Sequence, residues 1–384
     1  MAISQKLPVP SSKLFVWAFI PYRITEQGLV SDYDDKRDYQ DLANVFAELG
    51  LAWKWQPITL KNMHTVVEEV AASSNEYIPV VLNYCDGSEI DGYPGGSVIK
   101  LLEAKGIIFT GTDSNCYHLT TSKILMKRAF IKAGVATASY EVISDINHVE
   151  GVCDRVGTPA IVKPVTNLGG SSGIYLKSVV FNDEQARVQV QQLPQRLHDV
   201  KFLQDSIFVE QFINGSEFTV FLLGSANQPE SIKIYPPVER VFHSSLPETE
   251  QFLAYELYWT KDGEESSLPP SEPFCRYQLV TPPLHDKLCE LSKRAYCAVG
   301  GNGYARVDIR MDKTSQQLFV LEVNANCGIS SQHLSTFDDN DLGATSVGTI
   351  LHLARIPFAQ LMSELIVEAF ARHSTKLPLV SQAV

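Results

Sequence analysis

Two short runs in the C-terminal third, 304–311 and 319–324, alternate apolar and polar residues with a period of two, which is the pattern of paired β-strands. The polar segment DKTSQQ, 312–317, separates them and predicts a hairpin turn. With the turn centred near Ser315, Asp308 lies across from Glu322 on one face, and such neighbours are about 5 Å apart. The alternation predicts that Ala305, Val307, Ile309 and Met311 share one face of the first strand and Arg306, Asp308 and Arg310 the other, and that Phe319, Leu321 and Val323 share one face of the second strand and Val320, Glu322 and Asn324 the other.

The facing carboxylates of this hairpin point to a metal site. Asp308 and Glu322 repel each other unless positive charge lies between them, and the amide of Asn324 is their next neighbour on the same face. Hard oxygen ligands of this kind suit Mg²⁺, which proteins hold through one or two carboxylates together with substrate phosphates. The alternative is a solvated strand face, because alternating charged residues are common on exposed strands. The rest of the chain shifts the balance towards the metal site.

The composition is that of a globular protein with an acidic balance. The 384 residues suggest two or three domains, and 45% hydrophobic with 20% charged residues supplies more than one core. A net charge of −12 and a pI near 5.3 argue against nucleic acid or an anionic membrane as a partner. Any phosphate group must therefore be bound by a local basic site.

The sequence also predicts a cytoplasmic location. The N-terminal residues 1–13 lack the charged and apolar regions of a signal peptide, and no apolar run reaches the roughly 18 residues of a membrane span. The seven cysteines are scattered, with no CxxC pair, which argues against a zinc ribbon or a redox dithiol. Buried free thiols in a reducing compartment are the better interpretation.

The N-terminal part alternates strands and helices. Apolar runs predict strands at 13–21, 76–84 and 106–111, and helical spacing predicts helices at 37–50 and 95–106, each closed by a glycine. This order implies right-handed βαβ units and an open parallel sheet.

The pattern changes from about residue 118. An amphipathic helix is expected within 118–134 with Thr120 or Thr121 as its N-cap, followed by a strand at 159–165. Two strands are expected about an NGS turn within 207–224. Helices are expected at 284–300 and 358–373, and the polar, proline-rich stretch 258–273 lies between the strands and the first of these helices.

A lysine inside an apolar strand leads directly into a glycine-rich loop. Lys163 must reach the surface or meet an anion, because an unpaired buried ammonium is costly. The loop NLGGSSG, 167–173, offers successive backbone N–H groups of the kind that bind phosphate, although a tight hairpin has the same composition. The chain has neither GxxxxGK[ST] nor a GxGxxG after its first strand, so P-loop and dinucleotide folds are disfavoured. On local grounds Lys123 is a surface helix residue, and Glu210 and Glu217 are hairpin charges.

Taken in order, these motifs resemble the ATP-grasp superfamily, most closely the D-alanine–D-alanine ligases. The resemblance spans residue 80 to the final helix and is most specific at 159–173, 207–220 and 304–330. It implies an N-terminal open parallel α/β domain (1–117), a small central α+β lid domain (118–212) and a C-terminal α+β catalytic domain with an antiparallel sheet (213–384). It also implies small-molecule substrates and a homodimer.

The resemblance assigns roles at the matching positions. For ATP binding it implies phosphate contacts by Lys123, Lys163, Ser171, Ser172 and Gly173, adenine contacts by Glu210 and the segment from Gln211 to Ile213, and ribose contacts by Glu217. For metal binding it implies two Mg²⁺ ions, with Mn²⁺ as an alternative, on Asp308, Glu322 and Asn324. For the substrate carboxylate and the tetrahedral centre it implies Arg306 and Gly328.

The chemistry implied is ATP-dependent ligation of a carboxylate to an amine. Phosphorylation converts a poor electrophile into an acyl phosphate that an amine attacks, and phosphoryl transfer needs positioning and charge neutralisation more than a protein nucleophile. The acyl phosphate hydrolyses easily, so a lid must exclude water, and 258–273 is the candidate.

Three segments depart from the D-alanine–D-alanine ligase pattern. The first is 18–35, which replaces a glycine-rich segment carrying an acid. In the second, Tyr258–Trp259 stands where those ligases have a lysine and a tyrosine. In the third, His333 aligns with the serine that binds the acceptor carboxylate, and packing in the core is its alternative role. The departures favour a ligase that couples an amino acid to another carboxylate. D-Ala–D-Ala synthesis, amination of a carboxylate-like enol, a small-molecule kinase and a nucleotide-binding regulator are the alternatives.

Overall fold

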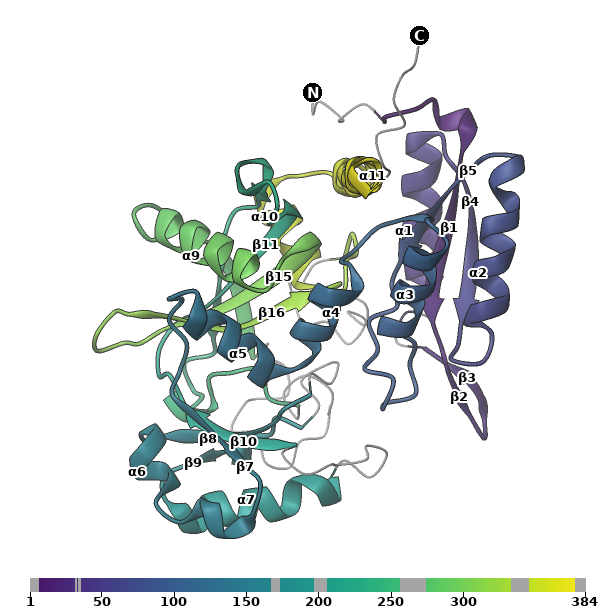
Figure 1. Cartoon of the computed structure of the whole chain (residues 1–384). Coiled ribbons are helices and arrows are strands. Elements are labelled where there is room, and N and C mark those ends of the chain that lie inside the picture. The colour runs from purple at the N-terminus through teal and green to yellow at the C-terminus, as the bar shows by residue number, and fades with distance from the viewer. Residues whose placement is uncertain are drawn as a thin grey trace.

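Three β-sheets of four or more strands succeed one another along the described part of the chain in the computed structural model (Figure 1). The structure describes residues 7–31, 33, 36–166, 173–196, 206–255, 274–332 and 345–376, with backbone only at 375 and 376. The N-terminal sheet stands beside the C-terminal sheet, and the central sheet lies below the C-terminal one in this view. Short 3₁₀ helices cover Ser11–Lys13, Ser73–Asn75, Ile146–Val149, Leu176–Ser178, Pro229–Ser231 and Glu248–Glu250.

The N-terminal sheet is parallel, as the alternation of strands and helices predicts. Its strand order is β4-β1-β5-β6, and its strands are β1 (Leu14–Pro21), β4 (Ala52–Ile58), β5 (Ile78–Asn83) and β6 (Ile108–Phe109). The helices are α1 (Lys36–Leu49), α2 (Met63–Ala72) and α3 (Gly96–Ala104). The predicted strands and helices are confirmed, and Gly50 and Gly106 close α1 and α3 with φ of +62°. The sequence analysis did not predict β4 and α2.

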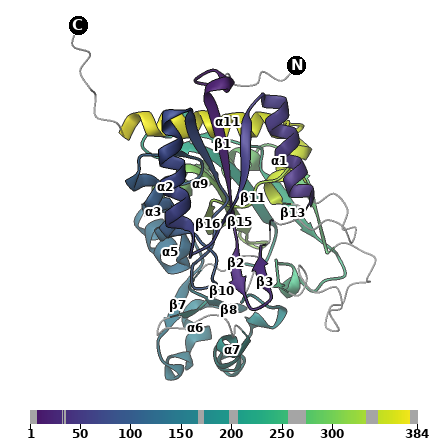
Figure 2. The same cartoon turned by 90° about the vertical axis from the view of Figure 1, so that its right-hand side faces the viewer.

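Both faces of this parallel sheet are covered, which explains its continuous apolar strands. Val81 and Phe19 pack with α2 and α3 on one face, while Val80 and Ala18 face α1 and the closing helix α11 (Phe358–Lys376). Figure 2 shows α11 running across the top of the molecule next to α1. A two-stranded hairpin, β2 (Arg23–Thr25) and β3 (Gly28–Val30), projects beyond the end of β1.

The helix expected within 118–134 begins later than predicted. Ser122 is the N-cap of α5 (Lys123–Lys132), its hydroxyl accepting from the Leu125 N–H at 3.4 Å. Thr120 and Thr121 belong instead to the last turn of α4 (Ser114–Thr121), where their hydroxyls donate to carbonyls of the preceding turn. The N-cap prediction was therefore wrong. The break arises because the extended backbone of Ser122 pairs with Thr166 of the central sheet.

The central sheet is antiparallel, with strand order β7-β10-β8-β9. Its strands are β7 (Tyr140–Ile143), β8 (Ala160–Pro164), β9 (Val179–Val180) and β10 (Ile207–Gln211). One face packs on α6 (Val152–Val156) and α7 (Asp183–Arg196), through residues such as Val162 and Val209. The opposite face of this sheet carries Lys163 and Glu210.

The C-terminal sheet is antiparallel and has six strands. Its order is β14-β13-β11-β15-β16, with β12 pairing β11, and the strands are β11 (Glu217–Ser225), β12 (Lys233–Ile234), β13 (Val238–Phe242), β14 (Cys275–Leu279), β15 (Asn302–Met311) and β16 (Leu318–Ala325). Phe218, Val307 and Val323 pack on one face against Met126 and Phe130 of α5 and against α9 (Leu284–Ala298). Helices α10 (Ser346–Ala354) and α11 are the last elements among the described residues.

The strands within 207–224 are confirmed, but they do not form a hairpin. β10 pairs within the central sheet and β11 within the C-terminal sheet, so the NGS segment passes from one sheet to the other. Gly215 has a φ of +148°, and a Cβ there would lie 2.1 Å from the Met311 carbonyl oxygen. Only glycine allows this close approach to the end of β15. The prediction that Glu210 and Glu217 are simple hairpin charges was wrong.

The late hairpin is confirmed, with one correction. Asp308 pairs with Glu322, as predicted, but the register shifts at the next position and Ile309 pairs with Val320. Leu321 is the extra residue of this bulge and lines a cavity beside Glu322, whereas Val320 is in the core with Val323. The predicted faces of Val320 and Leu321 were therefore wrong, because strict alternation does not allow for an inserted residue.

The hydrophobic cores cross the expected domain boundaries. One core joins β1 and β5 to Phe221 and Tyr304 of the C-terminal sheet through α10 and α11.

Among the described residues, no single helix is long and apolar enough to cross a bilayer. The pair Ser346–Ala354 and Phe358–Ser374 passes that test only together, and it bends by 115°.

Candidate functional site

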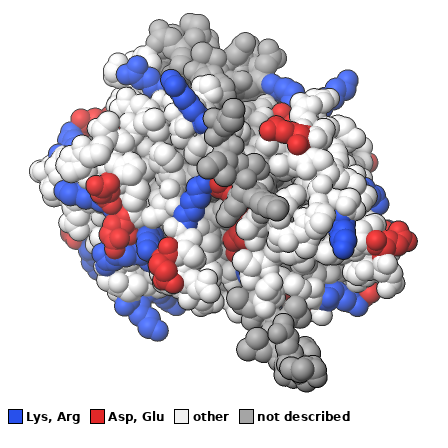
Figure 3. All heavy atoms as spheres, turned by 90° about the horizontal axis from the view of Figure 1, so that it is seen from above, with Lys and Arg blue, Asp and Glu red and all other residues white. Residues whose placement is uncertain are grey.

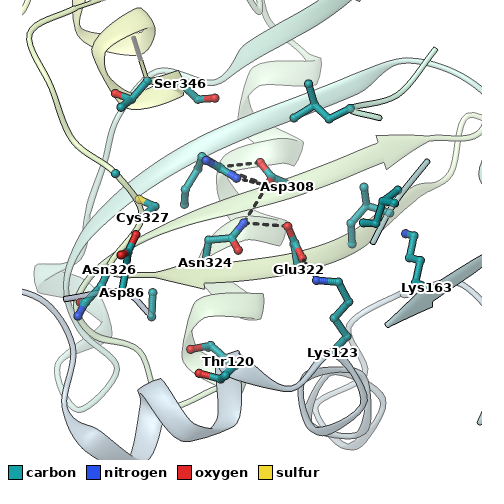
Figure 4. Close-up of a pocket in the computed structure, with 18 of the residues that line it drawn as sticks. Asp86, Thr120, Lys123, Lys163, Asp308, Glu322, Asn324, Asn326, Cys327 and Ser346 are labelled. Atoms are coloured by element: carbon teal, nitrogen blue, oxygen red, sulfur yellow. Dashed lines mark hydrogen bonds and ion pairs between the residues drawn. The ribbon is translucent and has the colours of Figure 1, made fainter. Parts of the chain in front are cut away.

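A cavity of about 420 Å³ lies where the three sheets meet. Its wall combines Asp86 and Tyr117 from the N-terminal part with Glu210 from the central sheet and Asp308 and Glu322 from the C-terminal sheet. Figure 4 shows the side chains of this site converging from β15, β16, β8 and α5. On the outer face seen in Figure 3, charged residues of both signs are interspersed. Inside the cavity, by contrast, the lining includes the basic side chains of Lys123, Lys127, Lys163 and Arg306.

The facing carboxylates of the hairpin are neutralised by the protein itself. Arg306 Nη2 lies 2.8 Å from Asp308, and Lys123 Nζ lies 2.9 Å from Glu322. Asn324 Nδ2 donates to both carboxylates at 3.0 Å (Figure 4). Asp308 is only 5% exposed and Lys123 only 6%. The solvated-face alternative, and the assignment of Lys123 to the outer helix surface, were therefore wrong.

These contacts keep Glu322 ionised. Burial would raise the pKa of the Glu322 carboxyl, but Lys123 and the Asn324 amide outweigh burial and lower that pKa to about 2. For Arg306, burial would lower the pKa of the guanidinium, but the adjacent Asp308 raises it above its ordinary value. Both groups are charged at neutral pH.

The donor set fits a magnesium ion. The described residues contain no cluster of three His, Cys, Asp or Glu side chains, so the candidate is the pair of carboxylates with the Asn324 amide. These are hard oxygen donors that share one wall of the cavity, and Mg²⁺ commonly takes only one or two carboxylates from the protein. Rotation of the Asn324 amide would present its oxygen in place of its nitrogen.

At the opposite end of the cavity, Glu210 is held by two lysines. Lys163 Nζ and Lys127 Nζ each lie 2.5 Å from one of its carboxylate oxygens, and Glu210 is 2% exposed. Lys163 thus meets an anion, as its place in an apolar strand predicts. Lys127 was not predicted. It lies four residues after Lys123, on the same face of α5, and this spacing is the signal that could have identified it.

Burial and pairing act in opposite directions in this cluster. Burial would raise the pKa of Glu210, but Lys127 and Lys163 lower it below its ordinary value. Burial is the largest effect on Lys127 and lowers the pKa of its ammonium, although Glu210 opposes that shift. The carboxylate is therefore fixed in its ionised form.

Glu217 is enclosed by two arginines from the neighbouring strands. It pairs in register with Arg240 of β13 on one side and with Arg310 of β15 on the other. Its Oε1 is bonded to Arg240 Nη1, and its Oε2 lies 3.5 Å from Arg310 Nη1. Neither arginine was assigned a role from the sequence, because the order of the strands is needed to see that both face Glu217.

The remaining predicted residues divide into two groups. Gln211, Ile213 and Gly328 line the same cavity, whereas Gly173 is described but is not part of the cavity wall. Ser171, Ser172, His333 and the candidate lid at 258–273 lie outside the described residues.

The N-terminal wall of the cavity was not predicted. It includes Tyr33, Asp38 and Asp86, and the Tyr33 hydroxyl donates to Asp86 at 2.7 Å. Cys327 and Ser346 also line the cavity (Figure 4). The DGSEIDG stretch that follows β5 was the nearest signal, because polar residues after the carboxyl end of a parallel strand commonly face a ligand.

Comparison with known proteins agrees with this arrangement. Residues 130–340 match the family model of the D-Ala D-Ala ligase C-terminus. The D-alanine–D-alanine ligase of Carboxydothermus hydrogenoformans is 28% identical over 245 residues, covering 62% of this chain and 69% of the relative. D-alanine–D-alanine ligase B of Xanthomonas campestris is 28% identical over 248 residues, covering 63% and 67%.

Solved structures show the same fold. The D-alanine–D-alanine ligase of Bacillus anthracis complexed with ATP superposes with a TM-score of 0.63 at 16% identity, covering 95% of this chain and 99% of that one. The ligase of Coxiella burnetii superposes with a TM-score of 0.58 at 16% identity, covering 94% and 97%. Because the family model matches more than half of the residues, the chain belongs to the D-Ala–D-Ala ligase family and has its ATP-grasp fold.

Proposed function

We propose that this protein is an ATP-dependent carboxylate–amine ligase. It activates a carboxylate as an acyl phosphate, couples it to the amine of an amino acid and releases ADP and phosphate. The observation that carries the proposal is the convergence of Lys123, Lys163, Arg306 and the facing carboxylates Asp308 and Glu322 on one cavity. Membership of the D-Ala–D-Ala ligase family supports the same reaction class.

In this proposal, basic residues bind the phosphates and the substrate carboxylate. Lys123 and Lys163 neutralise the phosphate oxygens of ATP, and Arg306 with the backbone of Gly328 binds the oxygens of the reacting carboxylate and of the tetrahedral centre. Phosphoryl transfer depends on such positioning and charge neutralisation, so no nucleophilic side chain is required. Glu210, Gln211 and Ile213 face the adenine.

Asp308, Glu322 and Asn324 would hold two Mg²⁺ ions, or Mn²⁺. A divalent ion held by these residues would supply neutralisation of the charge on the phosphates and polarisation of the transferring group. In the structure, Lys123 and Arg306 form salt bridges with Glu322 and Asp308. Arg306 and Lys123 therefore leave Asp308 and Glu322 when the ligands bind, and they become available to substrate oxygens.

The substrates are small molecules, and one is an amino acid. The named relatives are D-alanine–D-alanine ligases. Here Asp86 and Tyr33 form part of the cavity wall, and Tyr258–Trp259 and His333 replace residues of the ligase pattern. From these differences we propose that the carboxylate substrate is not D-alanine. By the same resemblance we propose a homodimer, and the scattered free cysteines favour a cytoplasmic location.

The test is ADP release from ATP and MgCl₂ with D- and L-amino acids, singly and in pairs with other carboxylates, with mass spectrometry of the products. A ligase consumes a carboxylate and an amine together and forms one ADP per product. ADP formed with a stable phosphorylated product and no amine consumed would instead identify a kinase. D-alanyl-D-alanine from D-alanine alone would assign the substrate of the named relatives.

A further inference from the structure

The pairing of Glu217 with two arginines is a feature that the proposed reaction does not itself require. Glu217 is 4% exposed, and Arg240 and Arg310 are each 2% exposed. The three residues lie side by side on β13, β11 and β15, and their register places both guanidinium groups against one carboxylate. One negative charge is thus enclosed by two positive charges.

Each arginine is itself fixed by further contacts. Arg240 Nε donates to the Tyr277 hydroxyl at 2.8 Å. Arg310 Nη2 donates to the carbonyl oxygens of Gly215 at 2.8 Å and Gln251 at 2.9 Å, and its guanidinium lies 4.7 Å from the centre of the Phe212 ring. Arg310 therefore connects Glu217 to the segment that joins β10 to β11. A carboxylate held in this way has little freedom to turn.

The geometry leaves one acceptor position on each carboxylate oxygen of Glu217. Each oxygen has two lone pairs, and each arginine takes one oxygen. Glu217 and Arg310 both line the cavity, as do Gln211 and Ile213, which the proposed function assigns to the adenine. A carboxylate with one open lone pair on each oxygen matches a ligand with two adjacent hydroxyl groups, such as the 2′ and 3′ hydroxyls of ribose.

We infer that Arg240 and Arg310 are positioning residues that hold Glu217 oriented towards both ribose hydroxyls, and that this cluster makes the protein select ribonucleotides over 2′-deoxyribonucleotides. The inference rests on the proposed function and on the ribose contact that the resemblance to the ligases implies for Glu217. A nucleotide that lacks the 2′ hydroxyl leaves one oxygen of a buried carboxylate without its donor, and sites of this kind reject the incomplete ligand. The expected preference for the ribonucleotide is about 10- to 100-fold in Kd.

The test is calorimetric titration of the full chain with ADP and with 2′-deoxy-ADP in MgCl₂, which needs no knowledge of the carboxylate substrate. The ratio of the two Kd values is measured for the wild type and for Glu217→Gln, Arg310→Met, Arg310→Lys and Arg240→Met. Arg276→Met, which removes an exposed arginine from the neighbouring strand β14, is the matched control. Thermal unfolding of each variant shows whether it is folded, and Arg310→Lys retains the charge where a methionine variant does not fold.

The expected result is a ratio that falls to near 1 in Glu217→Gln and drops about fivefold or more in Arg310→Met and Arg240→Met. Arg310→Lys should recover part of the ratio, and Arg276→Met should leave it unchanged. If folded Arg310→Met and Arg310→Lys have the same Kd ratio as the wild type while Glu217→Gln loses it, the inference is overturned and the proposed function stays intact. If the Kd ratio of the wild type itself is near 1, or if Glu217→Gln does not change it, both the inference and the assignment of Glu217 to the sugar are overturned.

Discussion

The two ends of the cavity treat their carboxylates differently. At the end proposed for the sugar and base, Glu217 and Glu210 each have two cationic partners, contributed by the sheets and by α5. At the end proposed for the metal, each carboxylate has one salt-bridge partner among the described residues, Arg306 for Asp308 and Lys123 for Glu322. The side chains of Arg306 and Glu322 are 20% and 22% exposed, whereas that of Glu210 is 3% exposed.

This difference indicates which contacts are permanent and which are exchanged. A buried carboxylate enclosed by two cations contributes to the stability of the fold, because removing one partner leaves a buried charge uncompensated. A carboxylate that has one cation at the cavity wall can exchange that cation for a metal ion without disturbing the core. In the proposed function, the site therefore combines a fixed end for the nucleoside with an exchangeable end for the phosphates.

The largest expected effect is on stability at the fixed end. Glu210→Gln leaves Lys127 and Lys163 without their carboxylate in a buried setting, so the free energy of unfolding in urea should fall by about 3–5 kcal/mol. Asp308→Asn should cost less than about 2 kcal/mol. Glu141→Gln, which breaks the exposed pair with Arg155 on the same central sheet, is the control and should change stability far less. Equal losses in Glu210→Gln and Asp308→Asn would remove the distinction between the two ends.

The next effect is on turnover at the exchangeable end. Asp308→Asn and Glu322→Gln each remove a charged ligand of the proposed metal site, and we expect ADP release to fall by about 100-fold or more. Asp286→Asn, which changes an acid on the exposed side of α9, should retain full activity. Turnover within twofold of the wild type in Asp308→Asn or Glu322→Gln would contradict the metal assignment.

A smaller effect is expected on nucleotide affinity. In the proposed function Lys123 moves from Glu322 to the phosphates when the nucleotide binds. Lys123→Met removes this cation, and the Kd for ADP with MgCl₂ should therefore rise about tenfold. Lys132→Met, at the exposed end of the same helix, serves as the control. An unchanged Kd in Lys123→Met would show that Lys123 has only a structural role on Glu322.

The smallest effect is a dependence of stability on pH. The pKa of Glu322 is lowered from 4.5 to about 2, so its pairing with Lys123 contributes fully above pH 4.5 and is lost as pH falls towards 2. The difference in unfolding free energy between the wild type and Lys123→Met should therefore be constant above pH 4.5 and shrink below it. Urea unfolding between pH 7 and pH 3 measures this difference, and one that grows as the pH falls would have the wrong sign.

The sequence predicted those parts of the site for which a local pattern determines which residues lie close together in the fold. The period of two in the late strands places Asp308 opposite Glu322 without knowledge of the fold, and an ammonium in an apolar strand requires an anion near Lys163. The parallel N-terminal sheet follows from its alternating strands and helices. These features depend on contacts within one element or between adjacent ones.

The rest depends on arrangements that no local pattern encodes. Arg240 faces Glu217 only because β13 lies beside β11, and Asp86 reaches the cavity only because the N-terminal part packs on the C-terminal sheet. The bulge at Leu321 inserts one residue and reverses the predicted faces beyond it. β4, with the sequence AWKWQPI, was missed because Lys54 and Gln56 interrupt its apolar residues at the edge of the sheet.

The central claim is that Asp308 and Glu322 exchange Arg306 and Lys123 for divalent cations when a nucleotide binds. Crystals grown with ADP and MnCl₂ test it directly, because manganese is located by anomalous scattering. We expect an anomalous peak between Asp308 and Glu322, next to the phosphates of ADP, with the Arg306 and Lys123 side chains turned away from these carboxylates. ADP bound in the cavity with no peak there, and with both ion pairs intact, would contradict it.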